Sequence, residues 1–270
     1  MIPRSPAQRE PVFNLPRSVL IAVLALVAIH AIREFLVPEN ADVQLIVDLA
    51  VIPARWTVGL GNATLDEVLR EIAATAGPNR TGLRALAHYV LGEGETKPWT
   101  AVTYALLHGS WTHVILNTVW LAAFGTPVAR RCGATRFFAL ALIAAAAGAA
   151  LHVLVYPLQV SPMIGASAAV SGMVAAAAWF MLAPSVFTLA GRAAEPHERP
   201  RESFASMIRN RRVVIFVVVW FVINLLTAYL ARPLGITDAS IAWEAHIGGF
   251  LAGLLLFPLV DPGTSLARGA

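Results

Sequence analysis

Long apolar runs separated by short polar segments dominate the sequence. A helix that crosses a bilayer needs about 20 mostly apolar residues. We therefore expect an all-α, polytopic membrane protein with six spans, at residues 18–37, 110–129, 135–156, 166–183, 213–231 and 241–260. The membrane domain would cover 18–260, between a short leading segment, 1–17, and a tail, 261–270.

The fourth apolar run is the shortest, and Pro162 and Gly165 stand directly before it. Both residue types interrupt helices, so the chain is expected to enter the membrane as irregular backbone and to become helical only partway down. Irregular backbone at that depth is tolerated where it is buried in protein or lines a wet cavity. The short fourth helix therefore indicates a site inside the membrane.

Composition and charge favour a membrane protein over a nucleic-acid-binding one. Only 13% of the 270 residues are charged, against about 25% in ordinary soluble domains. The net charge is +4, but the basic residues cluster between apolar runs, as membrane topology predicts. The single cysteine, Cys132, excludes an intramolecular disulfide. We expect no nucleic-acid partner and no cofactor, and the oligomeric state stays open.

Basic residues also predict the orientation. Thirteen of the twenty Arg and Lys residues lie in the segments on the side of the N-terminus, and six lie on the other side. The positive-inside rule then places both termini in the cytoplasm. No small-residue cleavage site follows the first apolar run, so an uncleaved first span is expected.

The external loop, 38–107, is too long for a plain connector. Thr64 and Glu67 have the spacing of a capping box, and apolar residues follow at helical intervals up to Gly77 and Pro78. This pattern predicts a short amphipathic helix on the outer surface. The cytoplasmic loop, 184–212, is polar throughout.

Strongly polar side chains inside spans are costly, and they are candidates for function. His113 and Asn117 are four residues apart and share a helix face, whereas His108 lies about 140° away from His113. The pair could form one small polar site or serve as hydrogen bonds between helices. We interpret His30, Arg33 and Glu34 as interfacial residues and His152 and Asn224 as packing residues.

Small residues recur every four positions in two spans. Ser167 and Ser171 form such a stripe in the fourth span, and Gly249 and Gly253 form one in the sixth. Packed face to face, the stripes would bring Ser167 near His246. A serine whose proton is taken by an imidazole, beside preorganised hydrogen-bond donors, can perform acyl transfer.

Other proteolytic chemistries lack their residues. A Ser-Lys dyad needs a lysine near the membrane serine, but Lys97 lies in the external loop. An aspartyl protease needs two buried aspartates, and no Asp lies well inside a predicted span. A zinc protease of the H-E-x-x-H type is excluded because that motif does not occur. A G-x-S-x-G elbow is excluded by Ala169.

Three motifs occur in the order, and on the predicted spans, that are typical of one family of membrane proteins. They are HGSWTHVILN at 108–117, GAS at 165–167 and AHIGGFLAG at 245–253. The chain resembles the rhomboid intramembrane serine proteases. The resemblance implies a dyad of Ser167, the nucleophile, and His246, the general base. It also implies an oxyanion hole with His113 and Asn117, and a pocket supported by His108, Gly165 and Gly249.

The resemblance further implies a setting and a substrate class. The expected location is the bacterial inner membrane, with a partly helical external loop and a cap over the site at 232–240. Substrates would be single-span membrane proteins, cleaved in or near the outer leaflet. The sequence departs from the family at three positions, with Thr100 in place of an arginine, Ala168 in place of a glycine and Ser171 in place of an aromatic residue.

Glu244 is two residues from His246, so on a helix it would point away from it, toward the external mouth. Two further functions remain open. One is a catalytically inactive rhomboid-like protein that binds client helices, which is disfavoured because both dyad residues are present. The other is a small transporter with a broken helix, which is disfavoured because no second broken helix pairs with the fourth.

Overall fold

Helices form the whole framework of the computed structural model, which describes residues 14–92, 95–188, 191–230 and 241–263. The helices of the apolar bundle are α1 (Arg17–Leu36), α7 (Trp111–Trp120), α8 (Thr126–Val155), α9 (Ser167–Ala178), α11 (Arg211–Leu230) and α12 (Trp243–Val260). The expected all-helical bundle is confirmed. The expected cap, 232–240, lies outside the described residues.

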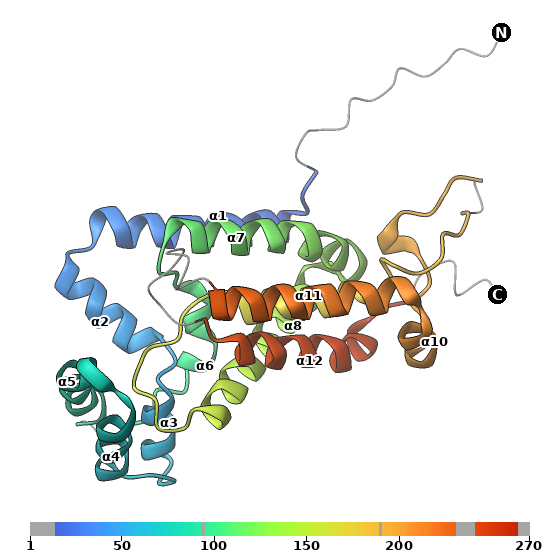
Figure 1. Ribbon diagram of the computed structural model, residues 1–270. Coiled ribbons are helices and arrows are strands. Elements are labelled where there is room, and N and C mark those ends of the chain that lie inside the picture. The colour runs from blue at the N-terminus through green and yellow to red at the C-terminus, as the bar shows by residue number, and fades with distance from the viewer. Residues whose placement is uncertain (1–13, 93–94, 189–190, 231–240, 264–270) are drawn as a thin grey trace.

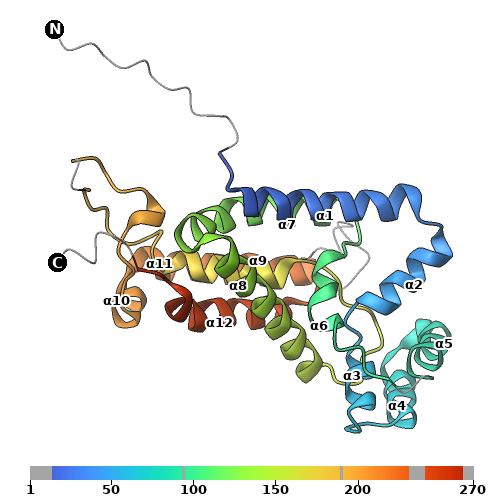
Figure 2. The same cartoon turned by 180° about the vertical axis from the view of Figure 1, so that it is seen from behind.

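Short helices lie at the two ends of the bundle. At one end are α2 (Glu39–Leu49), α3 (Pro53–Gly59), α4 (Leu65–Thr75), α5 (Arg80–Leu91) and α6 (Thr100–Thr103), with the 3-10 turns η1 (Gly77–Asn79) and η2 (Tyr104–Leu106). At the other end are η4 (Pro196–Glu198) and α10 (Phe204–Arg209). Figures 1 and 2 show α2, α4 and α5 far from α10, so the two long connecting loops lie at opposite ends.

Four helical segments of the described chain are long and apolar enough to cross a membrane. They are Arg17–Leu36, Trp111–Val155, Arg211–Leu230 and Trp243–Val260. The second of these is 45 residues long because α7, the π-helical turn η3 (Leu121–Gly125) and α8 follow one another without a gap. Gly133 interrupts it with φ 77° and ψ 170°, where the expected second and third spans were separated.

The fourth apolar run forms a shorter helix than its sequence predicts. The expected span was 166–183, but α9 ends at Ala178 and turns follow it. Twelve residues rise about 18 Å along a helix axis, against a hydrocarbon core of about 30 Å. Ten of its twelve residues are buried, so the helix lies inside the bundle.

The amphipathic helix expected within residues 38–107 is confirmed as α4. The Thr64 side chain accepts a hydrogen bond from the Glu67 backbone N–H, and the Glu67 carboxylate accepts one from the Thr64 N–H at 2.7 Å. Val68 and Ile72 are buried beneath it. The capping box and the apolar stripe therefore work together to fix this helix.

Small residues let α8, α9 and α12 form the tightest contacts of the bundle. A methyl group built on Gly249 would overlap the Ala168 carbonyl, and one on Gly253 would overlap the Gly172 carbonyl. The adjacent Gly248 lies instead against the backbone of α8 at Ala147. The neighbouring residues Gly248 and Gly249 of α12 thus contact α8 and α9, respectively. Small residues allow helix backbones to approach this closely.

The face of α9 that meets α12 differs from the expected one. Ala168 and Gly172 make the closest approach, and the expected stripe of Ser167 and Ser171 is wrong by one position. Ser171 Oγ donates a hydrogen bond of 2.7 Å to the Ser167 carbonyl. The Ser171 hydroxyl is therefore hydrogen-bonded within its own helix. Ala168 and Gly172, which follow the two serines, contact the glycines of α12.

Arg131 stabilises the end of the bundle that lies near η4 and α10. Its guanidinium forms two hydrogen bonds with Asp261, of 2.8 and 2.9 Å, and both side chains are almost fully buried. The same group donates to the carbonyls of His197 and Arg199 and lies 4.7 Å from the centre of the Phe180 ring. A buried charge needs such complete pairing.

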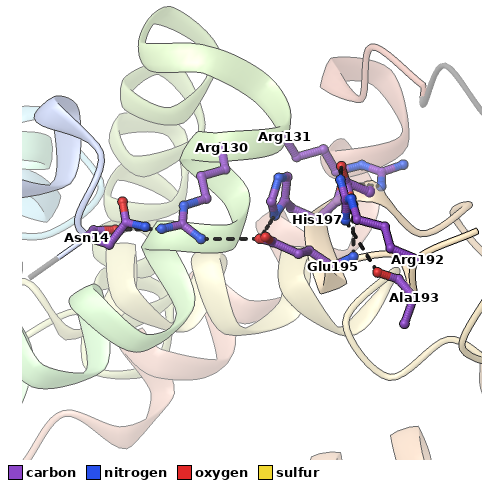
Figure 3. A network of polar contacts seen from close by, with 8 residues as sticks. Asn14, Arg130, Arg131, Arg192, Ala193, Glu195 and His197 are labelled. Atoms are coloured by element: carbon purple, nitrogen blue, oxygen red, sulfur yellow. Dashed lines mark hydrogen bonds and ion pairs between the residues drawn. The ribbon is translucent and has the colours of Figure 1, made fainter. Parts of the chain in front are cut away.

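A second, more exposed network surrounds this anchor (Figure 3). Arg130 donates to the Asn14 carbonyl at 2.6 Å and lies 3.6 Å from the Glu195 carboxylate. Glu195 also lies 3.5 Å from His197. These contacts tie the segment before α1 and the segment before α10 to the same turn of α8.

Candidate active site

Irregular backbone leads into α9 and is held by hydrogen bonds to the loop before α7. Met163 pairs with Val51 through two backbone hydrogen bonds, of 2.8 and 3.2 Å. The Gly165 N–H donates to the Tyr104 carbonyl at 3.0 Å. Helical structure then begins at Ser167. The backbone groups of this segment thus pair with partners on other elements and not within a helix of their own.

His113 lies directly over Gly165. A Cβ atom at Gly165 would stand 2.7 Å from both Cε1 and Nε2 of His113, and the glycine has φ +127°. Both the space and the backbone conformation therefore require glycine there. Gly165 is two residues before Ser167, so the imidazole of His113 comes close to the start of α9.

The rings of His108 and His113 lie against each other, with their centres 4.9 Å apart. The His108 side chain is buried, and its Nε2 accepts a hydrogen bond of 3.4 Å from the Ala166 N–H. His108, His113 and Gly165 thus lie close together. In the part of the chain that the structure describes, no group of three or more His, Cys, Asp or Glu residues is placed to hold a metal ion.

Asn117 lies one turn below His113 on α7 and is almost fully buried. Its Nδ2 donates to the His113 carbonyl at 3.0 Å. An amide NH₂ group carries two donors. One N–H therefore remains for another acceptor on the face that Asn117 shares with His113.

Two further residues, on α1, contact the segment that carries these histidines, and the sequence pattern did not single them out for that role. Arg33 forms two hydrogen bonds with Asp42, of 2.6 and 2.9 Å, and a third, of 3.0 Å, with the His108 carbonyl. His30 is buried, with its ring 4.7 Å from that of Trp111. Helix α7 therefore covers His30, a contact that its interpretation as an interfacial residue did not anticipate.

The long connection between α1 and α7 is held together at Thr100, where the family pattern would have an arginine. Trp56 Nε1 donates to Thr100 Oγ1 at 3.0 Å, and that hydroxyl donates to the Lys97 carbonyl at 2.7 Å. Lys97 also forms an ion pair of 2.5 Å with Asp48. These contacts hold the loop without a guanidinium at position 100.

The methyl group of Ala168 packs against α8. A Cβ at Gly148 would stand 2.5 Å from the Ala168 Cβ, so the alanine fills the space that this glycine leaves. Ala168 is fully buried in a cluster that includes Tyr104 and Ala245. The departure from glycine at this position is therefore matched by a glycine on the neighbouring helix.

His246 lies in the first turn of α12, three residues before the glycine that touches Ala168. This contact brings the first turn of α9 against the second turn of α12. His246 Nδ1 is hydrogen-bonded to Asn224 Oδ1 of α11 at 2.6 Å. Among the hydrogen bonds of the described residues, none joins His246 to Ser167. Catalytic hydrogen bonds of unliganded sites are often long and tighten only with substrate.

Asn224 was expected to be a packing residue, and its contact with His246 was missed. The sequence carried no signal for it, because the two residues lie on separate helices. Trp220, one turn earlier on α11, stacks on Phe250 of α12 at 4.7 Å. This stacking explains why the polar side chain reaches the imidazole.

Glu244 does not face the external mouth, contrary to expectation. It is buried, and its Oε1 lies 2.5 Å from His152 Nδ1 near the end of α8. A buried carboxylate is costly unless it is paired. The close packing of α8 on α12 supplies this partner, so the interpretation of His152 as simple packing is also incomplete.

Sequence matches to known proteins identify the family. A family model described as a Rhomboid domain matches residues 95–261. The rhomboid protease GlpG of Serratia proteamaculans is 25% identical over 252 residues, which is 84% of this chain and 77% of that protein. The rhomboid protease GlpG of Pectobacterium atrosepticum is 27% identical over 164 residues, 58% of this chain and 47% of that protein. Since the family model covers more than half of the chain, from residue 95 to the end of α12, the protein belongs to the rhomboid family.

Proposed function

We propose that the protein is an intramembrane serine endopeptidase with Ser167 as nucleophile and His246 as general base. The observation that carries this proposal is the convergence at the start of α9. His113 covers Gly165 on one side of Ser167, and Gly249 of α12 touches Ala168 on the other. The names of the two GlpG relatives support the same activity.

In the proposed reaction, His246 Nε2 takes the proton of Ser167 Oγ as the oxygen attacks the scissile carbonyl. The tetrahedral intermediate then collapses, and the imidazolium gives its proton to the leaving amine. Water, activated by the same histidine, hydrolyses the acyl-enzyme and regenerates Ser167. The dyad contains no carboxylate, since Glu244 is paired with His152.

Negative charge develops on the substrate carbonyl during attack, and it needs donors already in position. We assign this role to the His113 ring, the second N–H of the Asn117 amide and the backbone N–H of Ser167. The first N–H groups of a helix have no partner within the helix, and the helix dipole there favours an anion. Ser167 is the first residue of α9.

We further propose six membrane crossings. They are α1, the two parts of the segment 111–155 on either side of Gly133, the short helix α9, α11 and α12. In this topology both termini lie in the cytoplasm, in the orientation that the basic residues favour. Helices α2 to α6 then lie on the outer side, at one end of the bundle (Figure 2).

The substrates that fit this site are single-span membrane proteins whose helix unwinds close to the outer surface. A protease needs extended backbone at its nucleophile, and Ser167 lies at the end of α9 that adjoins the outer loop. The inner membrane of a bacterium is the location that we propose. An inactive, client-binding rhomboid remains the alternative.

Reaction with a fluorophosphonate probe tests the proposal. Purified wild-type protein should be labelled and should cleave a single-span substrate, whereas Ser167→Ala and His246→Ala should do neither. Ser171→Ala is the matched control, because this serine lies one turn away on the same helix and donates only to a carbonyl. Labelling that persists in Ser167→Ala would exclude this serine as the nucleophile. A folded wild-type protein that neither reacts nor cleaves would favour the client-binding alternative.

A further inference from the structure

Asn224 is a polar residue on α11, a helix whose side chains are mostly apolar. Helix α11 has only two buried residues, Val213 and Trp220, and many of its apolar side chains are exposed. An amide on such a helix is costly unless its groups are paired. Asn224 has partners for both ends of its amide, one on its own helix and one on α12.

These two partners fix which way the amide points. Asn224 Nδ2 donates to the Trp220 carbonyl at 2.8 Å. A carbonyl can only accept, so the NH₂ end must face Trp220, and the oxygen must face His246. The distance between Asn224 Oδ1 and His246 Nδ1 is 2.6 Å.

An amide oxygen has no proton to donate, so the hydrogen bond requires a proton on His246 Nδ1. In the neutral imidazole the other nitrogen, Nε2, then carries the lone pair. This is the nitrogen to which the proposed mechanism assigns the proton of Ser167. The dyad has no carboxylate to select this tautomer, whereas the amide of α11 is in position to do so.

We propose that Asn224 is a positioning residue that holds His246 in the tautomer with its proton on Nδ1 and its lone pair on Nε2. The inference rests on the proposed function, because it assigns the orientation of the general base. Asn224 acts through His246 and does not touch the substrate carbonyl.

Aromatic contacts keep Asn224 in register with His246. The Trp220 ring stacks on Phe250 at 4.7 Å, and Phe221 meets the same ring edge-on at 5.6 Å. Phe250 lies one turn beyond His246 on α12. The packing of a largely exposed helix thereby sets the orientation of the base.

The test compares Asn224→Leu, which keeps the volume but has no acceptor, with Asn224→Asp, which keeps an acceptor toward Nδ1. For Leu we expect kcat on a single-span substrate and the rate of fluorophosphonate labelling to fall about 10- to 100-fold, with KM unchanged. Asn224→Asp should be at least several-fold faster than Leu. Asn224→Ala is the second variant should Leu fail to fold, and the same loss is expected from it.

Thr227→Val is the matched control. Thr227 lies one turn further on α11, is exposed, and bonds only to the carbonyl of Ile223 in its own helix at 2.7 Å. Its rates should equal those of the wild type. ¹⁵N NMR of labelled histidine should show a proton on Nδ1 of neutral His246 in the wild type, and a shift toward Nε2–H in Asn224→Leu.

Two results separate the inference from the function on which it rests. If Ser167→Ala retains activity, the proposed dyad fails, whatever Asn224 does. If the activity depends on Ser167 but Asn224→Leu or Asn224→Ala keeps wild-type kcat per labelled site, only the inference is wrong, and Asn224 has a structural role. A lower melting temperature with an unchanged rate would lead to the same conclusion.

Discussion

Gly172 offers a direct test of the three-helix contact that carries the candidate site. A methyl group at this position would overlap the Cβ of Ala144 on α8 and would stand 3.2 Å from the Gly249 carbonyl of α12. Apolar carbons prefer a separation of about 3.5–4.0 Å. Gly172→Ala must therefore push α8 and α9 apart by about an ångström.

The expected cost combines two opposing terms. Overpacking of a tight core typically costs about 1–3 kcal/mol, whereas alanine gains about 1 kcal/mol over glycine in a helix interior. The backbone of α12 limits relaxation, so the steric cost should lie near its upper end. We expect a net loss of about 1–2 kcal/mol of unfolding free energy, and slower fluorophosphonate labelling because α9 carries Ser167.

Ala144→Gly removes the closest partner of the new methyl group. In the double variant the steric cost should largely disappear, so the two changes should be non-additive by about 1–2 kcal/mol. Unfolding in mixed micelles with increasing SDS measures all four proteins. Gly82→Ala on the exposed face of α5 is the control, since its Cβ meets only the flexible Asn79 side chain, at 3.2 Å.

Two results would refute the reasoning. A Gly172→Ala protein as stable as the wild type would mean that the helices do not approach as closely as the structure has them. Additive losses in the double variant would mean that Ala144 is not the group that the methyl displaces. Stability restored without a restored labelling rate would separate the packing of α9 from the position of Ser167.

Three other predictions concern the two ends of the bundle. Arg131→Met should lower the unfolding free energy by about 3 kcal/mol, because it leaves the buried carboxylate of Asp261 poorly paired. Titration with SDS measures this loss. A loss under about 1 kcal/mol would contradict the prediction. Thr64→Ala should speed hydrogen exchange in the first turn of α4 and cost about 1 kcal/mol locally, with no effect on cleavage. The Arg192 side chain, by hydrogen bonding, lowers the pKa of Glu198 to about 2. The turn at η4 should therefore resist proteolysis fully above about pH 4.5 and lose this protection as the pH falls toward 2, and Glu198→Gln should abolish the pH dependence.

The local pattern of the sequence was sufficient for several elements. Apolar runs of about 20 residues located the long helices within a few positions, and the spacing of Thr64 and Glu67 located the start of α4. Pro162 and Gly165 located the beginning of the short helix at Ser167, because neither continues a helix. These features depend on neighbours within one or two turns, so the sequence alone determines them.

Contacts between helices needed the tertiary structure. Successive side chains on a helix are rotated by about 100° about the helix axis. The rotation of α9 about its axis therefore decides whether Ser167 and Ser171 or the residues after them contact α12. That rotation depends on the fit of three helices at once, and the structure selected Ala168 and Gly172. The pairing of Glu244 with His152 and of His246 with Asn224 joins residues 92 and 22 positions apart.

The dyad of Ser167 and His246 stays a prediction from the motifs, and the structure adds the surroundings in which it can be tested. Sequence determined which chemical groups are available and where each helix begins, because those depend on local propensity and apolar length. Tertiary packing decided which groups face one another, because close approach depends on the side chains of every helix at the contact. For His246 the partner came from α11, a helix that its own sequence marks only as apolar.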